Sequence, residues 1–571
     1  MIDSPLGGDP RPPAAPPSAK PIREACTLVL VRDGESGVET LLLRRDPNAQ
    51  FLPGHFVFPG GALVPEDREA RAMQRIRGLD DRRASERLGV ASGGLACWLA
   101  AVRETFEECG LLLAVDETGR GLDTARLAAA AADRPALNAG TLSFADFLAK
   151  HRLDVPAGEL VYFDHWLTPP TRPRRFDTRF FMARAPEGQV EAHDGAEVVD
   201  ARWVRPADAL AEIARGAIET AHATAAMLEM LAGRTSAEDA LAAASAVGEI
   251  EINRPCVAQG SSGPRLFRRN DAAYHEIHWC DPQETMQTSY ELVPGVVKRL
   301  DGLVARLIAG NPGPMTGPGT NTYFVGEREL AVIDPGPDDD AHLAAILAHG
   351  AGRIRWILCT HTHRDHSPAA ARLQAATGAQ VIGMPAPEAP RHDTTFAPDR
   401  VVRDGEALDL GGVRLVALHT PGHASNHVCY LLPSTRMLFT GDHVMQGSTV
   451  VIAPPDGDMR RYLASLDRLL AIDLAILAPG HGYLIGHPHR EVRKLIAHRL
   501  WREERVLESL ERAGAATPED LVGDVYPDLD PRKHRAAARS LEAHLIKLAA
   551  DGDVVAEGGR YAVRGESQAG C

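Results

Sequence analysis

Three histidines and one aspartate fall within six positions of this chain, from His361 to His366. Residues 354–359 just before them form an apolar run that predicts a short buried strand, and Ser367 and Pro368 just after them predict the start of a helix. The cluster is therefore expected on a tight turn between a strand and a helix. Imidazole nitrogens and carboxylate oxygens that converge there would make a metal site.

Four further apolar runs are followed by polar residues of the same kind. In layered α/β folds, sites assemble at the edge where strands end. We therefore expect these later residues to join the first cluster at one sheet edge. The runs are residues 329–333, 413–419, 437–440 and 475–478, and the residues after them include Asp334, His423, Asp442 and His481.

Seven of these groups can hold two metal ions. Zinc prefers four nitrogen or oxygen ligands, and a catalytic zinc leaves one position for water. Two ions about 3.5–4 Å apart can activate one water and clamp both the attacking and the leaving oxygen. The predicted ligands are His361, His363 and His423 for one zinc ion, Asp365, His366 and His481 for the other, and Asp442 between them.

Other polar residues near these motifs match no ligand position. We interpret Asp334 as a partner that orients a ligand histidine. The remaining histidines are expected to be structural or solvated, and they are His419, His427, His443, His487 and His489.

These motifs resemble those of the metallo-β-lactamase superfamily, in which HxHxDH, a later histidine, a bridging aspartate and a final histidine follow one another. The resemblance implies an αββα sandwich over residues 286–490. It also implies that Asp365 is catalytic, because this residue would orient the attacking water and take up its proton. The loop from Asn311 to Tyr323 is similar to that of the lactamase-β-like protein 2 branch, which includes a single-strand endoribonuclease.

A second group of ligand-type residues lies near the N-terminus. Glu104, Glu107 and Glu108 stand at i, i+3 and i+4 of a helix expected over residues 101–109, so they share one face. That face could bind Mg²⁺ or Mn²⁺, since hard ions take oxygen ligands and bridge phosphates. It could equally be a solvated acidic face. Arg103 is placed four residues before Glu107 and could orient it.

Residues 60–61, two glycines, and residues 103–111 resemble the two halves of a Nudix box. The resemblance implies an α/β/α sandwich over residues 22–235 that hydrolyses a diphosphate with Mg²⁺, and it makes the three glutamates metal ligands and catalytic groups. An insertion over residues 68–94 separates the halves, as in Nudix proteins of the peroxisomal coenzyme A diphosphatase type.

The acidic residue of the glycine loop has two candidates. Asp67 occupies its position when the spacing is counted from Gly61, and Glu66 when it is counted from Gly60.

Residues 491–571 fit the small winged-helix domain that the lactamase-β-like protein 2 branch carries. A capping pattern at Thr517 predicts a helix start, and residues 552–563 predict the hairpin wing. A basic segment could contact a phosphate backbone, but a solvated helix face is the favoured interpretation. Its basic residues are Arg532, Lys533, Arg535 and Arg539.

Composition sets further limits. A chain of 571 residues is expected to form about three domains. Its formal net charge of −15 argues against a broad nucleic-acid grip, because that grip depends on Lys and Arg. Eight cysteines without a CxxC pair suggest a reducing cytoplasm. No apolar run reaches the ~18 residues of a membrane span. We expect a disordered Pro- and Ala-rich tail over residues 1–21 and a linker over residues 236–285.

These features predict a bifunctional metal-dependent hydrolase. The C-terminal zinc centre would cleave phosphodiesters of single-stranded RNA, and the Nudix centre would cleave a small-molecule diphosphate of the nucleoside diphosphate or coenzyme A type. An alternative is a zinc thioesterase that acts on acyl-coenzyme A or acyl-glutathione. In a further alternative, the Nudix half only binds its ligand. The oligomeric state stays open.

Overall fold

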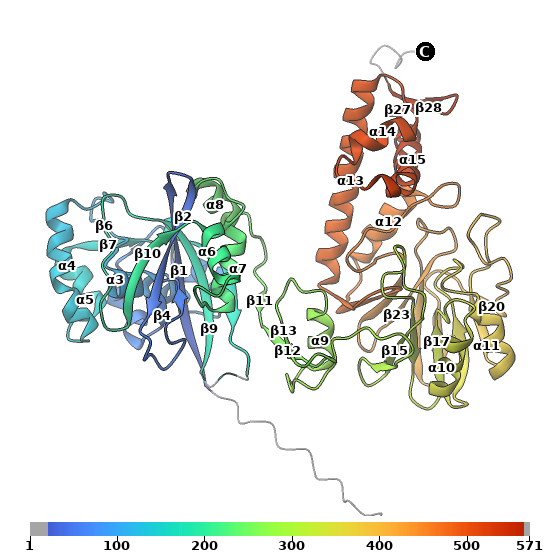
Figure 1. The fold of residues 1–571 in the computed structure, drawn as a ribbon, viewed down its shortest axis with the longest axis horizontal. Coiled ribbons are helices and arrows are strands. Elements are labelled where there is room, and N and C mark those ends of the chain that lie inside the picture. Colours follow the sequence, from blue (N-terminus) through green and yellow to red (C-terminus); the bar gives the residue numbers. More distant parts are fainter. Residues whose placement is uncertain (1–20, 171, 173, 565–571) are drawn as a thin grey trace, which may run out of the picture. The chain divides into compact units, whose positions relative to one another are not determined.

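The computed structural model describes residues 21–170, 172 and 174–564, and the chain divides into two compact units, Met1–Pro255 and Cys256–Cys571 (Figure 1). The tail predicted over residues 1–21 lies outside the described residues, apart from Pro21. No helix in the described part of the chain combines the length and the apolar character that a membrane span requires.

The first unit is built on an eight-stranded mixed sheet. Its strands are β1 (Ile22–Gly34), β2 (Gly37–Arg45), β3 (Phe56–Val57), β4 (Gly60–Ala62), β8 (Val161–Leu167), β9 (Arg175–Arg184), β10 (Val198–Val204) and β11 (Ile252–Asn253). The order is β10-β2-β1-β9-β8-β11, with β3 beside β2 and β4 beside β1. β1 and β2 form the expected hairpin, and β1 pairs in parallel with β9.

Helices cover both faces of this sheet, as the alternation of side chains along β1 requires. Leu28 shares a core with Trp98 of α3, and Val29 shares another with Leu228 of α7. The predicted α/β/α sandwich is therefore confirmed. The helices are α3 (Leu95–Cys109), α4 (Thr124–Asn138) and α5 (Phe144–His151) on one side, and α6 (Pro206–Ala214), α7 (His222–Leu231) and α8 (Ala237–Ser245) on the other.

The insertion over residues 68–94 is folded. It holds α1 (Ala70–Met73), β5 (Ile76–Arg77) and α2 (Asp81–Leu88), and β5 joins β7 (Leu153–Pro156) and β6 (Val115–Asp116) in a small sheet. Ala72, Ala84 and Leu88 of the insertion are buried in the same core as Trp98. The insertion thus extends the side of the sheet that carries α3.

The second unit contains a sandwich of two sheets. The first sheet has the strands β14 (Lys298–Arg299), β15 (Val304–Ile308), β16 (Asn321–Val325), β17 (Leu330–Ile333), β18 (Ile354–Leu358), β19 (Gln380–Gly383) and β20 (Arg400–Val401) in that order. The second has β21 (Ala407–Leu410), β22 (Val413–His419), β23 (Val428–Leu432), β24 (Met437–Gly441), β25 (Ile476–Pro479) and β26 (Ile485–Gly486).

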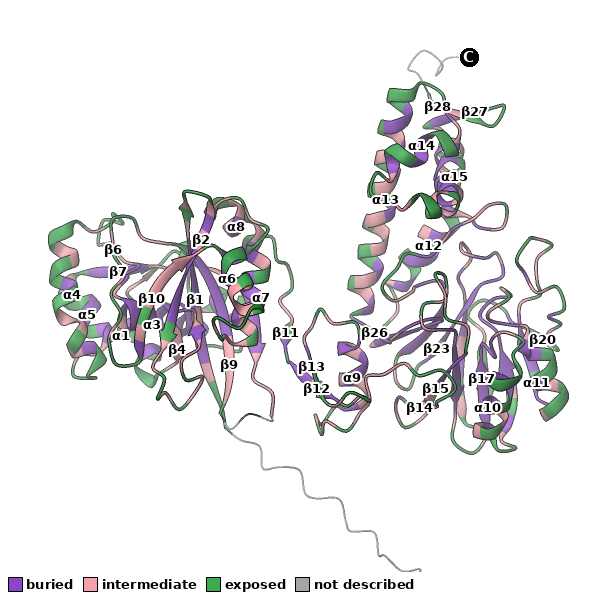
Figure 2. Ribbon diagram, viewed as in Figure 1, coloured by how far each residue is buried: buried purple, intermediate pink, exposed green. Residues whose placement is uncertain are grey.

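An apolar core lies between these sheets, where Tyr323 of β16 meets Phe439 of β24 with ring centroids 5.1 Å apart. α10 (Asp340–Gly350) and α11 (Ala369–Thr377) pack on the outer face of the first sheet, and α12 (Met459–Leu469) packs on the outer face of the second (Figure 2). The expected αββα layers are confirmed.

A small domain follows the sandwich. Its elements are α13 (Pro488–Ala513), α14 (Pro518–Val525), α15 (His534–Asp551) and a hairpin of β27 (Val554–Glu557) and β28 (Arg560–Val563). Thr517 caps α14 through a capping box with Asp520, as its sequence indicates. Arg532 pairs with Asp530, and Lys533 is exposed. The winged-helix architecture is confirmed.

Two local expectations differ from the structure. Residues 236–285 are not a plain linker, because they hold α8, β11, β12 (Cys256–Ala258), β13 (Arg265–Phe267) and α9 (Tyr274–Cys280), and the units divide between Pro255 and Cys256.

Ser367 does not cap a helix. Its hydroxyl donates instead to Asp393 (3.0 Å), and α11 begins at Ala369 with Pro368 at the cap position.

Candidate metal centres

Asp334 organises the start of the histidine cluster. It follows β17 with a φ of 51°, a left-handed conformation that stores strain in a residue other than glycine. Its carboxylate accepts hydrogen bonds from the backbone N–H (2.7 Å) and the hydroxyl (2.8 Å) of Thr360, and it lies 2.9 Å from Nδ1 of His366. The expected contact to a ligand histidine is present, and it leaves Nε2 of His366 available to a metal ion.

His361, His363 and His423 bring one ring nitrogen each within 4.8 Å of one another. Nε2 of His361 and Nε2 of His423 each lie 3.0 Å from Nδ1 of His363. The other nitrogen of His423 lies 2.8 Å from the carbonyl oxygen of Val451, and the other nitrogen of His361 lies 3.0 Å from the hydroxyl of Thr360. Ligand histidines are typically oriented by such contacts at the outer nitrogen.

Asp365, His366, Asp442 and His481 form the second group, and their ligand atoms also lie within 4.8 Å of one another. Nε2 of His481 is 3.3 Å from the carboxylates of Asp365 and Asp442, and Nε2 of His366 is 3.4 Å from both. The other oxygen of Asp442 lies 3.7 Å from Nε2 of His423. Asp442 therefore occupies the position between the groups that a bridging ligand requires.

The second group has buried polar atoms that fit a metal ion. Nε2 of His366, Nε2 of His481 and Oδ1 of Asp442 have no hydrogen-bond partner among the described residues. An unsatisfied buried polar atom costs about 1–3 kcal/mol. A metal ion bound to these three atoms would satisfy all of them. The nitrogen and oxygen donors of both groups suit divalent ions, and this is the donor set that zinc prefers.

Charge divides the two groups. Burial, assisted by neighbouring histidines, lowers the pKa of His361 and lowers that of His363 to about 3. Burial acts in the same direction on His366 and His481, but the neighbouring carboxylates outweigh it and raise the pKa of His366, and that of His481 to about 9. The first group thus holds neutral imidazoles, whereas protons balance the carboxylates of the second. A metal ion there would displace those protons.

His392 and Asp456 belong to this centre, although the sequence motifs did not indicate them. Nδ1 of His392 lies 2.7 Å from the hydroxyl of Thr362, its Nε2 lies 3.0 Å from Asp456, and its ring centroid is 4.7 Å from that of His363. Asp456 also accepts a hydrogen bond from the backbone N–H of Ser425. The pair supports the turn that carries His363, and no strand or repeat in the sequence points to it.

Most of the histidines that match no ligand position are structural, as expected. His427 is buried and stacks on His361 with ring centroids 5.0 Å apart. His419 and His489 lie 2.9 and 2.8 Å from the backbone carbonyls of Ser425 and Ile472. His419 lies at the end of β22 and His427 just before β23, whereas His489 joins α13 to the loop that follows α12.

In the first unit, the glycine loop brings two of the three glutamates to β4. The backbone N–H of Gly60 donates to Glu108 (2.9 Å). A β-carbon on Gly61 would lie 2.5 Å from the carboxylate of Glu104, and one on Gly60 would lie 2.4 Å from the carbonyl of Cys26. Only glycine allows this close approach at either position.

Arg103 ties the acidic face together. Its guanidinium makes two hydrogen bonds to Asp67 (2.9 and 3.0 Å) and one each to Glu104 and Glu107 (both 2.9 Å). Asp67 and Arg103 are buried, whereas Glu66 is exposed. Asp67 is therefore the acid of the glycine loop, and the predicted orientation of Glu107 by Arg103 is present.

The charge of these carboxylates suits a divalent cation, but their present positions do not yet form a close ligand group. Burial, opposed by Arg103, raises the pKa of Glu104 to about 7 and that of Glu107 as well, and burial beside Glu104 raises the pKa of Glu108. Among the described residues, however, the three glutamates are not one of the groups whose ligand atoms all lie within 4.8 Å. A cation bound here would stabilise the charged carboxylates and draw them together.

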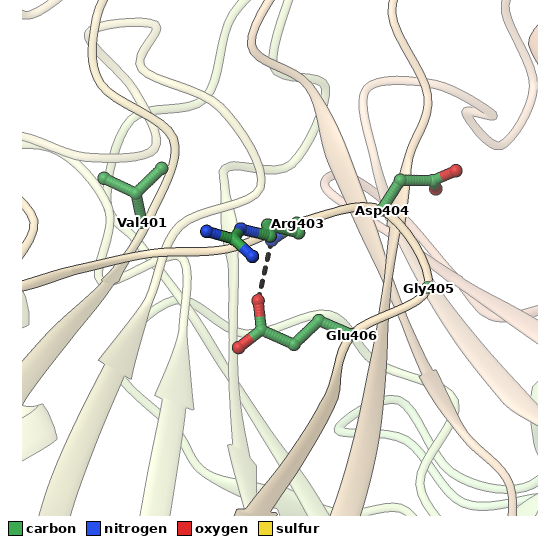
Figure 3. A pocket seen from close by; sticks show the side chains of 5 residues that line it. All are labelled: Val401, Arg403, Asp404, Gly405 and Glu406. Atoms are coloured by element: carbon green, nitrogen blue, oxygen red, sulfur yellow. Dashed lines mark hydrogen bonds between the residues drawn. The ribbon is translucent and has the colours of Figure 1, made fainter.

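A surface pocket of about 560 Å³ lies apart from these residues in the sequence. It is lined by Val401 and residues 403–406, where the backbone N–H of Arg403 donates to Glu406 (2.7 Å) (Figure 3). None of the candidate ligands lines it.

Family models match three parts of the chain. A model described as the metallo-beta-lactamase superfamily matches residues 315–481, one described as the beta-lactamase associated winged helix domain matches residues 517–561, and one described as the NUDT19 Nudix domain matches residues 73–223.

Several relatives are similar to about half of the chain. "Lactamase-like protein aptB" of Emericella nidulans is 32% identical over 47% of this chain and 88% of its own length. "Atrochrysone carboxyl ACP thioesterase" of Aspergillus chevalieri is 30% identical over 51% of this chain and 95% of its own length. "Beta-lactamase-like protein 2 homolog" of Caenorhabditis elegans is 29% identical over 45% and 88%.

Solved structures resemble both halves. A metallo-beta-lactamase family protein from Thermus thermophilus is 26% identical, with 47% of this chain and 100% of that chain covered and a TM-score of 0.40. A NUDIX hydrolase from Alicyclobacillus acidocaldarius is 32% identical, with 41% and 100% covered and a TM-score of 0.33.

Proposed function

The chain belongs to the metallo-β-lactamase superfamily and also carries Nudix and winged-helix domains, and we propose that its two metal centres hydrolyse two bonds of one thioester substrate. The substrate class is a phosphopantetheine thioester such as acyl-coenzyme A. The C-terminal centre would cleave the thioester, and the Nudix centre would cleave the diphosphate.

The observation that carries this proposal is that one chain holds two separate sets of candidate metal ligands, each of a type used in hydrolysis. An imidazole-rich set suits acyl transfer or phosphodiester cleavage, and a carboxylate set beside a glycine loop suits a diphosphate. Acyl-coenzyme A contains both a thioester and a diphosphate. Relatives named as an acyl carrier protein thioesterase and as "Thioesterase pkgB" support the thioester step.

In the C-terminal centre, bound divalent ions would polarise water and stabilise the charge that develops on the substrate oxygen. Asp442 would hold the two ligand groups at a fixed separation. The side chain of Asp365 is 28% exposed, whereas those of His366 and His481 are at most 4% exposed. Asp365 is therefore the acidic ligand that substrate water can reach, and it would take up the proton of the attacking water. The water oxygen bonds to the acyl carbon, the C–S bond breaks, and the thiolate leaves.

In the Nudix centre, a bound Mg²⁺ or Mn²⁺ would neutralise the diphosphate. Glu104 and Glu108 would hold it beside the glycine loop, and Arg103 would keep Glu107 on the same side of α3. Water adds to one phosphorus and the bridging P–O bond breaks, which releases two phosphate monoesters.

A pair of variants tests the division of labour. Purified full-length protein is given acyl-coenzyme A with zinc and magnesium, and free thiol and 3′,5′-ADP are measured separately. Asp442→Asn should abolish thiol release and keep ADP release, and Glu107→Gln with Glu108→Gln should do the reverse. His489→Gln serves as the control for a histidine outside the centre. The proposal fails if the wild-type protein does not release both products.

A second candidate function is cleavage of single-stranded RNA by the C-terminal centre. The likeness to a beta-lactamase-like protein 2 homologue and the winged-helix domain favour it. Release of short fragments from a labelled single-stranded RNA, lost in Asp442→Asn, together with no thiol release from acyl-coenzyme A, would select this function over the first.

A further inference from the structure

We propose that Arg364 and Arg391 form an oxyanion-binding pair beside the C-terminal metal centre. The pair would hold a phosphate or carboxylate of the thiol leaving group while the thioester lies at the metal ions. The identity of the ligand rests on the proposed thioesterase function, but the existence of an anion site at the pair does not.

The chain register sets the two arginines opposite each other. His363 and His392 form an antiparallel bridge, and the backbone N–H of Asp393 donates to the carbonyl of Thr362 (2.6 Å) on one side of it. One position further on the other side, an antiparallel register places Arg364 against Arg391. The register opposes the two backbone positions, and two cationic side chains that leave facing positions repel each other. A bound anion between them would reverse the sign of that interaction.

Neither guanidinium is engaged within the described part of the chain. Arg364 and Arg391 are both exposed, and no hydrogen bond, ion pair or ring contact joins their side chains to another described residue. Arg372 of α11, a nearby exposed arginine in the sequence, bonds instead to Asp338 and Asp340 (2.6 Å each). Two opposed arginines therefore keep all their donors free.

The loop that carries Arg391 is anchored on both sides. Nδ2 of Asn426 donates to the carbonyl of Pro385 (3.1 Å), and His392 is held between Thr362 and Asp456. Arg391 itself has a φ of 79°, which a residue with a side chain adopts only where its surroundings enforce it. The anchors thus hold an arginine at a strained position, where a glycine would cost less.

The position and chemistry of the pair suit a substrate anion. Arg364 lies in the chain between the ligands His363 and Asp365, so an anion held beside it could belong to a molecule that reaches the metal centre. The guanidinium fork matches phosphate and carboxylate oxygens in a bidentate way. Because the whole chain carries a formal charge of −15, an anionic substrate needs such a local positive field to approach.

Two thiol leaving groups carry the required oxyanion. Cleavage of the diphosphate of acyl-coenzyme A leaves an acyl-phosphopantetheine with a terminal phosphate, and acyl-glutathione carries carboxylates. Both have bidentate oxygens on the thiol side of the scissile bond. Acyl-pantetheine is the matched thioester that lacks the phosphate.

The test compares the full-length protein with the double variant Arg364→Gln and Arg391→Gln. We expect the KM for acyl-phosphopantetheine to rise by about tenfold to a hundredfold, since charged hydrogen bonds are lost, and kcat and the KM for acyl-pantetheine to stay unchanged. Acyl-glutathione distinguishes a phosphate ligand from a carboxylate ligand. If its KM rises as well in the double variant, the pair binds oxyanions in general; if its KM does not rise, the pair binds phosphate. Arg372→Gln is the control for an exposed, ion-paired arginine.

A binding measurement does not depend on turnover. Titration of inorganic phosphate into metal-free protein, followed by calorimetry or by the amide spectrum of residues 362–365 and 391–393, should give saturable binding that the double variant loses. Full phosphate binding by the double variant would overturn the inference even if no thioester is hydrolysed. The inference would also be overturned if the double variant raised the KM for acyl-pantetheine as much as that for acyl-phosphopantetheine. A double variant that lost only RNA cleavage would overturn it as well.

Discussion

The two candidate metal centres differ in how far the protein has assembled them. The C-terminal centre has two groups of ligand atoms, and within each group the atoms already lie within 4.8 Å of one another. Several of these atoms are buried and have no hydrogen-bond partner among the described residues. In the Nudix centre, the carboxylates are engaged by Arg103 and by the backbone of Gly60. The ligands of the first centre already lie close together, whereas the carboxylates of the second bond to Arg103 and to the backbone N–H of Gly60.

The difference follows from the chemistry of the ligands. The neutral imidazoles of the first group can approach one another without charge repulsion, and in the second group His366 and His481 offset the charge of two carboxylates. Strand ends from two sheets can therefore place both groups together. Three carboxylates on one helix face repel one another unless a cation lies between them. Arg103 supplies that cation, so its partner Asp67 controls the arrangement of the Nudix centre as Asp334 and Asp442 control that of the other.

The largest effect should come from the residue that joins the two histidine groups. Asp442→Asn keeps the size of the side chain and removes its charge, and we expect the C-terminal hydrolysis to fall by roughly a thousandfold or more, because several kcal/mol of metal-dependent stabilisation are lost. Bound metal per chain, measured by elemental analysis, should fall as well. Full metal content together with full rate would show that the groups do not need a bridge.

Breaking the corresponding pair in the Nudix unit should cost stability. Asp67→Ala leaves the buried guanidinium of Arg103 without its main partner, and the loss should be about 3–5 kcal/mol. Hydrogen exchange of peptides from α3 measures it locally, since a two-unit chain does not unfold in a single step. Glu66→Ala, at the exposed neighbour, should change the exchange by less than about 0.5 kcal/mol. Equal effects of the two variants would contradict the assignment of Asp67.

A buried ion pair also supports the C-terminal centre, and it should respond to acid. Glu276 bonds to Arg306 (2.7 and 2.9 Å), and Arg306 donates to the carbonyl of Gly482 (3.1 Å) next to His481. Burial acts against the charge of Glu276, but Arg306 and Lys298 outweigh it and lower its pKa to about 2.

Because the folded pKa lies below the ordinary value, the stabilisation is complete above about pH 4.5 and is lost as the pH falls toward 2. Its size should be about 3 kcal/mol. Glu276→Gln should flatten the acid limb of the stability curve for the second unit, measured by hydrogen exchange across β15 and β26. An unchanged acid limb in this variant would show that other carboxylates control it.

The smallest effect concerns a residue that only orients a ligand. Asp334→Asn keeps one oxygen that can accept from the backbone N–H of Thr360, but it replaces the oxygen beside the Thr360 hydroxyl and Nδ1 of His366 by an NH2 group that cannot accept. Such changes typically lower metal affinity by about 10–100-fold. Competition with a chelator of known affinity measures the change. A loss as large as that of Asp442→Asn would mean that Asp334 binds the metal itself.

The sequence predicted the parts of both centres that follow a period or a motif. Glu104, Glu107 and Glu108 share a face because of helical spacing. His361, His423, Asp442 and His481 come together because each follows a strand, but the strands belong to both sheets of the sandwich and not to one sheet edge as expected. The layers of both sandwiches were implied by the resemblance of these motifs to two known families.

Contacts between irregular segments could not be predicted in this way. His392 and Asp456 lie on loops, and their pairing depends on how the 384–393 loop folds back on Thr362. Whether Glu66 or Asp67 is the acid of the glycine loop depends on which side chain is buried. Counting the spacing from Gly60 or Gly61 in the sequence does not show this. The segment over residues 236–285 has weak periodicity, yet its short elements pack into apolar cores of their own units.

The central claim is that both centres act on one substrate, and product analysis of acyl-coenzyme A hydrolysis in heavy-oxygen water tests it most directly. The wild-type protein should yield the free acid with one heavy oxygen in its carboxylate, free phosphopantetheine thiol, and heavy oxygen in one of the two phosphate products. Recovery of the intact thioester or of the intact diphosphate after complete turnover of the other bond would contradict it.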